Sequence, residues 1–113
     1  MGDSSFEELC THLNAALEAD GSGLSAVYDR EQWDWSLTRV DGEQFYLGWN
    51  TNDDVILSLL GLDDLEFNAV REGTAIVETM IAFVHGRVTV GKTWNPFSRR
   101  IEVRPLNGKP FTL

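Results

Sequence analysis

The stretch that decides the fold is WDWSLTRVDGEQFYLGW, residues 33–49. Apolar and polar side chains alternate on both sides of a central Asp41-Gly42. The apolar positions are Trp33, Trp35 and Leu37 before the turn and Phe45, Leu47 and Trp49 after it. A period of two is typical of strands with one buried face, so the stretch predicts an antiparallel hairpin.

The register of this hairpin follows from its pattern. A two-residue Asp41-Gly42 turn would pair Trp35 with Gly48 and place Phe45 on the opposite face from Trp35. A three-residue loop over residues 40–42, with Gly42 left-handed, instead makes one face wholly apolar. The pairs it predicts are Arg39 with Glu43, Leu37 with Phe45, Trp35 with Leu47 and Trp33 with Trp49.

Two segments have helical periodicity. The first begins at Ser4 or Ser5, which are candidate N-caps, and ends at Gly21 and Gly23. Its apolar stripe is Phe6, Leu9, Cys10, Leu13, Ala16 and Leu17. The second runs from Asn68 or Arg71 to His85, with Gly86 at the C-terminal cap position. Its stripe is Val70, Gly73, Ile76, Val77, Met80, Ile81 and Val84, and we expect Gly73 to let the helix approach the sheet closely.

The remaining segments complete the predicted fold. Strands are expected at residues 24–29, 87–93 and 100–104, while residues 53–61 fit either a buried strand, which we favour, or a short helix. The prediction is an α+β fold: an antiparallel sheet of about five strands with two helices packed on one face, in the order α-β-β-β-(β)-α-β-β. This order resembles that of small partner-binding folds such as secretion chaperones and immunity proteins, although no residue motif supports a family assignment.

Length and composition fit one soluble domain over residues 1–113. The chain is 42% apolar and 24% charged, contains one cysteine and has a net charge of −9. Residues 1–68 carry fifteen acids against two arginines, whereas residues 69–113 carry three acids against seven basic residues. We expect a cytoplasmic protein, because no apolar run is long enough to span a bilayer.

One motif suggests a nucleotide site. Gly86 to Thr93 reads GRVTVGKT and fits the phosphate-loop pattern G-x-x-x-x-G-K-[ST]. That loop needs a strand before it and a helix after it. Here a helical segment precedes it, its variable positions favour a strand, and Pro96 disfavours a following helix. We therefore interpret the match as accidental.

Other reactive residues form no pattern typical of a catalytic or metal site. Cys10 and His12 lie two apart on a helix and so point in different directions. His85 is predicted on the exposed side of the second helix, and the acidic pairs 53/54 and 63/64 are typical of turns and caps. The sequence predicts no metal site, no cofactor and no catalytic residue.

Aromatic residues give the candidate binding sites. The loop between the last two predicted strands groups Lys92, Trp94, Phe97, Arg99 and Arg100. Tryptophan and arginine are common in interface hot spots, which favours a non-catalytic module with a protein partner, including its own copy. The alternatives are a small apolar ligand or an enzyme site in a pocket lined by Trp33, Trp35 and Trp49, and an acidic nucleic-acid mimic. The acidic balance argues against a nucleic-acid partner, and we expect no membrane partner.

Overall fold

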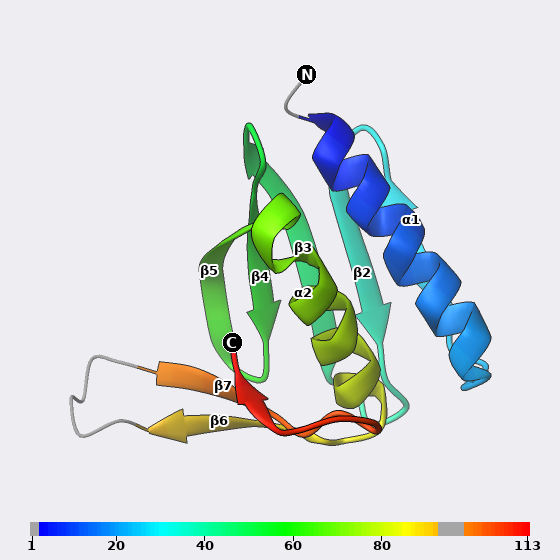
Figure 1. The fold of residues 1–113 in the computed structure, drawn as a ribbon. Helices are drawn as coiled ribbons and strands as arrows, with labels where there is room; N and C mark the ends of the chain where they lie inside the picture. Colours follow the sequence, from blue (N-terminus) through cyan, green and yellow to red (C-terminus); the bar gives the residue numbers. More distant parts are fainter. Residues whose placement is uncertain (1–2, 93–98) are drawn as a thin grey trace.

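The computed structural model describes residues 3–92 and 99–113 (Figure 1). Its elements, in chain order, are α1 Asp3–Asp20, β1 Ala26–Asp29, β2 Asp34–Thr38, β3 Gln44–Thr51, β4 Asp54–Leu59, β5 Leu62–Asn68, α2 Ala69–Val84, β6 Val88–Lys92, β7 Arg99–Val103 and β8 Phe111–Thr112. Among the described residues, neither helix is both long and apolar enough to cross a membrane.

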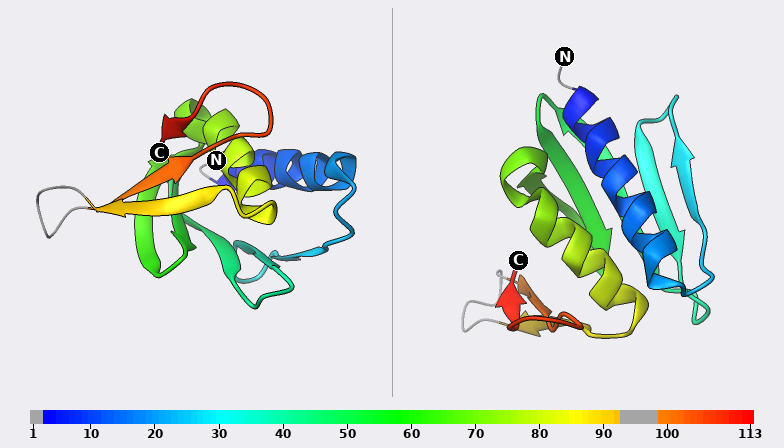
Figure 2. Two further views of the ribbon diagram at one scale, coloured as in Figure 1. Left: turned by 90° about the horizontal axis from the view of Figure 1, so that it is seen from below. Right: turned by 45° about the vertical axis from the view of Figure 1, so that its right-hand side comes forward.

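The five strands between the helices form one antiparallel sheet in the order β1-β2-β3-β4-β5. Both helices lie on the same side of this sheet, as the left view of Figure 2 shows. The last three strands form a second antiparallel sheet in the order β6-β7-β8. The predicted class, α+β with a five-stranded antiparallel sheet under two helices, is confirmed.

The central hairpin has the predicted register. Trp35 pairs with Leu47 and Leu37 with Phe45. The Arg39 N–H donates to the Glu43 carbonyl at 2.8 Å, and Gly42 has φ +89°. Trp33 pairs with Trp49 through one backbone hydrogen bond of 2.9 Å. The alternation fixes this register because a one-residue slip would turn the apolar side chains of one strand to the other face.

Strands β4 and β5 settle the ambiguous region. Residues 54–59 form a strand whose alternate residues Val55, Leu57 and Leu59 are buried. β5 was not predicted, because the acidic pair at residues 63 and 64 is typical of turns and caps. A tight turn at Leu60-Gly61, with φ +49° and +83°, joins the two strands and has the backbone signs of a type I′ hairpin.

The strands after α2 differ from the prediction in their placement. They were expected to complete the main sheet, but β5 is its fifth strand and β6, β7 and β8 pair only among themselves. Their apolar side chains Val88, Ile101 and Val103 are at most 5% exposed and belong to the same core as the helices. The second sheet lies on the helix side of the main sheet (Figure 2, left).

The ends of α2 match the prediction, whereas the start of α1 does not. The Asn68 side chain caps α2 by accepting hydrogen bonds from the Val70 and Arg71 amides, while Glu72 accepts from the Asn68 amide at 2.7 Å. Gly86 follows the helix with φ +69°. α1 begins at Asp3, so Ser4 and Ser5 lie inside the helix and the prediction that one of them is its N-cap is wrong. The helix ends before Gly21, whose φ is +71°.

Aromatic rings and the helix stripes fill the space between sheet and helices. Phe45 meets the fully buried Trp35 edge-on, with ring centroids 6.0 Å apart, and also contacts Phe83 of α2 at 5.7 Å. Gly73 does not serve the contact predicted for it. A Cβ at Gly73 would lie 3.8 Å from Leu9 Cδ1, so the glycine faces α1 rather than the sheet.

Candidate functional site

The phosphate-loop match is not a phosphate loop in the structure. Val88–Lys92 form the edge strand β6, which pairs antiparallel with β7. The variable positions of the motif are therefore extended and cannot fold around a phosphate as successive loop amides do. The segment before them is α2, as predicted, and Thr93 lies outside the described residues.

The predicted aromatic–basic loop falls largely outside the described residues, which do not include Trp94 and Phe97. Lys92 and Arg99 are register partners at the end of the β6–β7 hairpin. The Arg100 side chain is 51% exposed and lies 3.4 Å from Glu102. Gly91 makes room for this pair, because a Cβ there would lie 2.9 Å from the Glu102 carboxyl group.

The three tryptophans of the hairpin occupy different environments. Trp35 is fully buried, and its Nε1–H donates to Asn14 Oδ1 of α1 at 2.9 Å. Trp33 and Trp49 are half-buried at the edge of the core, with ring centroids 6.2 Å apart. Trp33 precedes β2 in a left-handed conformation with φ +54°. The cavities described below are lined by other residues.

Cys10 and His85 both make contacts that stabilise the fold. Burial, with a smaller contribution from Glu7, raises the pKa of the Cys10 thiol to about 12, so the thiol stays protonated at neutral pH. His85 caps the end of α2, and its Nε2 lies 2.9 Å from Asp20 at the end of α1. The described residues contain no group of three metal-binding side chains, and each of their buried polar side-chain atoms has a hydrogen-bond partner.

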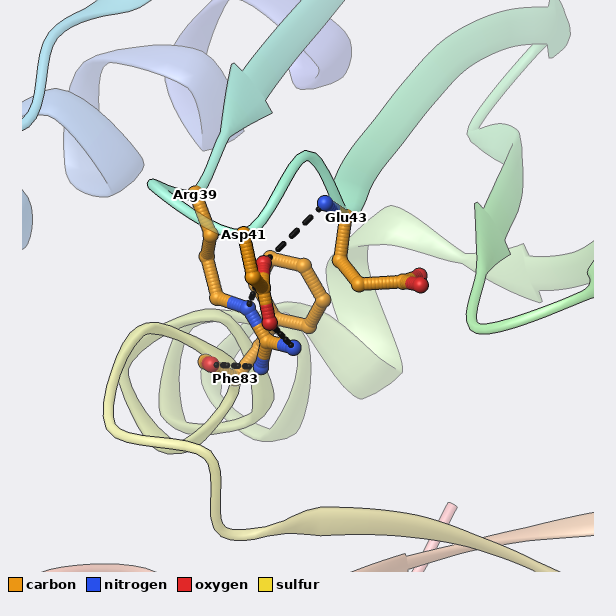
Figure 3. A network of polar contacts seen from close by, with 4 residues as sticks. All are labelled: Arg39, Asp41, Glu43 and Phe83. Atoms are coloured by element: carbon orange, nitrogen blue, oxygen red, sulfur yellow. Dashed lines mark hydrogen bonds and ion pairs between the residues drawn. The ribbon is translucent and has the colours of Figure 1, made fainter.

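A polar network centred on Arg39 is shown in Figure 3. Its Nη1 donates to the Phe83 carbonyl at 2.8 Å, and its Nε and Nη2 contact both carboxylate oxygens of Asp41 at 3.1 and 2.7 Å. Asp41 in turn accepts from the Glu43 amide at 3.1 Å. These bonds tie the β2–β3 hairpin to the C-terminus of α2.

The opposite side of the main sheet is where polar groups gather. Strand residues that alternate with the buried ones must point away from the helices. Register places Val27, Ser36, Tyr46 and Ser58 in one row across β1, β2, β3 and β4. It places Asp29, Asp34, Gly48, Ile56 and Glu66 in the next row, which crosses all five strands.

This surface, which we call the acidic face, consists of those two rows together with Asp54 of β4. It carries carboxylates from β1, β2, β4 and β5 and no lysine or arginine. The two arginines of residues 1–68 lie on the helix side, where Arg39 contacts α2 and Arg30 pairs with Glu7 of α1 at 2.8 Å. The acidic face therefore carries only negative charge because the fold places both arginines on the helix side, and not only because residues 1–68 are rich in acids.

Tyr46 lies at the centre of the acidic face. Its hydroxyl donates to Asp34 at 3.3 Å, and its ring lies over Gly48, where a Cβ would be 3.0 Å from the hydroxyl oxygen. Burial raises the pKa of Tyr46 above its usual value, and the negative charges of Asp34 and Asp64 raise it further. The phenol therefore stays a neutral hydrogen-bond donor at physiological pH.

The acidic face contains a pair of like charges, of which Asp29 accepts from the Glu31 and Gln32 amides and Asp34 from the Tyr46 hydroxyl. Asp29 and Asp34 are register partners on adjacent strands, and like charges directly opposite each other destabilise a sheet. This surface is not evident from the sequence alone, because it depends on the register of five strands. The available signal was weak: the polar positions of the strands predicted before the second helix include acids but no basic residue.

Cavities also lie on the helix side of the molecule. One of about 380 Å³ lies between the helices, with Leu9, Gly73 and Val77 among its lining and Glu8 and Glu78 on opposite helices. Another of about 630 Å³ lies beside the Arg39 network and is lined by Ser22, Leu24, Arg39, Val40, Asp41, Val84, His85 and Gly86.

Comparisons of the chain with models of known protein families, with curated proteins and with solved structures found no match.

Proposed function

We propose that this protein is a non-catalytic binding module whose acidic face binds a basic surface of a partner protein. One observation supports the proposal: this face of the sheet, which no other helix or strand of the described residues covers, carries charge of a single sign. Four strands contribute Asp29, Asp34, Asp54 and Glu66, and none contributes a lysine or arginine. A basic protein surface is the complement of such a face.

The arrangement of side chains supports an interface. Protein interfaces combine an apolar or aromatic centre with a polar rim, and tyrosine is enriched among their strongest contributors. Here Tyr46 and Ile56 are half-buried and Val27 is 64% exposed, while the carboxylates lie around them. A partner can therefore gain apolar contact at the centre and ion pairs at the edge.

Repulsion within the acidic face also supports a cationic partner. The free protein carries the like-charge pair Asp29 and Asp34 across two strands. A lysine or arginine placed between these carboxylates would turn repulsion into attraction. Such an interaction accelerates association and weakens as salt increases.

A charge-reversal comparison tests the proposal. Immobilised protein would capture partners from host lysate at two salt concentrations, alongside the variant Asp63→Lys/Glu66→Lys. Glu66 belongs to the acidic face, and Asp63 lines a recess together with Tyr46 and Ser58 of that face. The control is Glu18→Lys/Glu78→Lys, which makes the same charge change at exposed positions on the helices. We expect a salt-sensitive basic partner that the control retains and the acidic-face variant loses. Equal capture by both variants would contradict the proposal.

A further inference from the structure

A recess of about 220 Å³ lies at one end of the acidic face, beside the start of β3 and the turn between β4 and β5. Tyr46 and Ser58 of the acidic face line it, together with Glu43, Gln44 and Asp63. Tyr46 and Ser58 are register partners on β3 and β4, so the recess borders a row of side chains that points away from the helices. It therefore belongs to the same side of the sheet as the acidic face.

An irregularity in the sheet places the acids of β5 at this recess. The pairing of β4 with β5 shifts between Leu57 and Leu59, so Ser58 lies opposite two residues, Asp63 and Asp64. The Ser58 hydroxyl accepts from the Asp64 amide at 3.1 Å, and Asp64 has a left-handed φ of +57°. An extra residue of this kind redirects side chains at the edge of a sheet. Both acids of the pair are thus held beside the same serine.

The carboxylates of the recess have no cation beside them. Among the described residues, neither Glu43 nor Asp63 forms an ion pair through its side chain, and Figure 3 shows the Glu43 carboxylate pointing away from the Arg39 network. No lysine, arginine or histidine lines the recess. The cavity between the helices, in contrast, is lined by His12, and the cavity beside Arg39 is lined by that arginine and His85. Charge complementarity therefore favours a cation from outside the chain at this recess.

The groups around the recess fit a guanidinium better than an ammonium. A guanidinium is planar, donates five N–H bonds and stacks on aromatic rings, whereas an ammonium is a compact charge with three donors. The acceptors here are spread over three strands, with Gln44 on β3, the Ser58 hydroxyl on β4 and Asp63 on β5. Tyr46 adds an aromatic ring against which a guanidinium can lie. A broad, flat donor can reach more of these groups than a point charge can.

We propose that this recess binds the guanidinium group of an arginine from the basic partner. The group pairs with the carboxylates of Glu43 and Asp63 and lies against the ring of Tyr46. The proposal rests on the proposed function, because it names the side chain by which the partner is anchored on the acidic face. It goes further in giving the two parts of the surface different roles: the strand carboxylates attract any basic surface, while the recess selects arginine over lysine.

Titration with N-acetylarginine amide, followed by two-dimensional NMR of the backbone amides, tests the recess without the partner. We expect saturable shifts concentrated at Gln44, Ser58 and Asp63. N-acetyllysine amide at the same ionic strength should bind at least about threefold more weakly, because an ammonium makes fewer of these contacts. Equal affinities for the two compounds, or shifts spread evenly over the acidic face, would overturn the proposal.

A pair of matched variants locates the binding energy. Glu43→Gln/Asp63→Asn removes both charges of the recess and should raise the dissociation constant of N-acetylarginine amide at least about fivefold. Asp29→Asn/Glu66→Gln makes the same change of net charge on the acidic face outside the recess, and should change that constant much less. Equal effects of the two variants would contradict a specific arginine site. Unchanged circular dichroism melts would show that both variants fold.

Capture from lysate separates this inference from the proposed function. We expect Glu43→Gln/Asp63→Asn to lose more of the partner than Asp29→Asn/Glu66→Gln does. If the two variants lose it equally while Asp63→Lys/Glu66→Lys abolishes capture, the recess is not the anchor but the acidic face still binds the partner. If none of these variants changes capture, both proposals are wrong.

Discussion

The guanidinium carbon of Arg39 lies 4.4 Å from the ring centroid of Phe83, and Arg39 Nη1 also donates to the carbonyl oxygen of Phe83 at 2.8 Å. One residue of the hairpin thus contacts both the side chain and the backbone at the end of α2. A positive charge is favourable there because the C-terminal end of a helix is partly negative. The contact links two elements that are more than forty residues apart in the chain.

Replacing Arg39 by lysine tests this link. An ammonium group cannot stack on the ring, bind Asp41 through two nitrogens and reach the Phe83 carbonyl at once. We expect Arg39→Lys to lower the free energy of unfolding by about 1–2 kcal/mol, measured by urea denaturation followed by tryptophan fluorescence. Arg71→Lys, at an exposed position of α2, is the control and should have little effect.

Asp41 should contribute to acid sensitivity. Its hydrogen bonds from Arg39, and then from the Glu43 amide, hold the pKa of Asp41 below its usual 3.8. Because the folded pKa is the lower one, its contribution to stability is present above pH 3.8 and is lost as the pH falls through the folded pKa. Thermal melts of Asp41→Asn should therefore depend less on pH below 3.8 than those of the wild type. Identical pH profiles would contradict this role.

Gly73 offers a stabilising substitution. A methyl group at this position would meet Leu9 Cδ1 at 3.8 Å, an ordinary contact distance, and the backbone is helical. Alanine also restricts the unfolded chain more than glycine does. We expect Gly73→Ala to raise the free energy of unfolding by about 0.5–1 kcal/mol in chemical denaturation. A loss of stability would mean that the helices cannot accommodate the methyl group.

Gly48 should control the position of Tyr46. A Cβ at residue 48 would lie 3.0 Å from the Tyr46 hydroxyl oxygen, so Gly48→Ala must displace the ring. A ring moved outward loses burial and its contact with Asp34, so we expect the pKa of Tyr46 to fall toward its ordinary value of 10.0. A pH titration by NMR would measure this shift. Tyr28, which lies on the helix side, is the internal reference and should not change.

Asp34→Asn separates stability from binding. The substitution removes the repulsion with Asp29 and keeps an oxygen that can accept from the Tyr46 hydroxyl. We expect the free energy of unfolding to rise by about 0.2–1 kcal/mol. Capture of the basic partner should weaken in the same variant, because a carboxylate of the acidic face is lost. Lower stability in denaturant titrations would show that Asp34 is needed for folding.

The sequence by itself determined the local elements and one register. Alternation over residues 33–49 fixed the hairpin pairing, because only one register makes a face wholly apolar. The apolar stripes and glycine stops located both helices to within a few residues. These signals are local, so they act within one element or across one turn.

The tertiary structure decided everything that depends on distant segments. β5 could not be predicted because its acids resemble a turn until β4 provides a partner strand. The second sheet and the contact of Gly73 with α1 depend on how elements pack, which no local period encodes. The acidic face is the clearest case: its carboxylates come from four strands, and only pairing across the sheet brings charges far apart in sequence onto one surface.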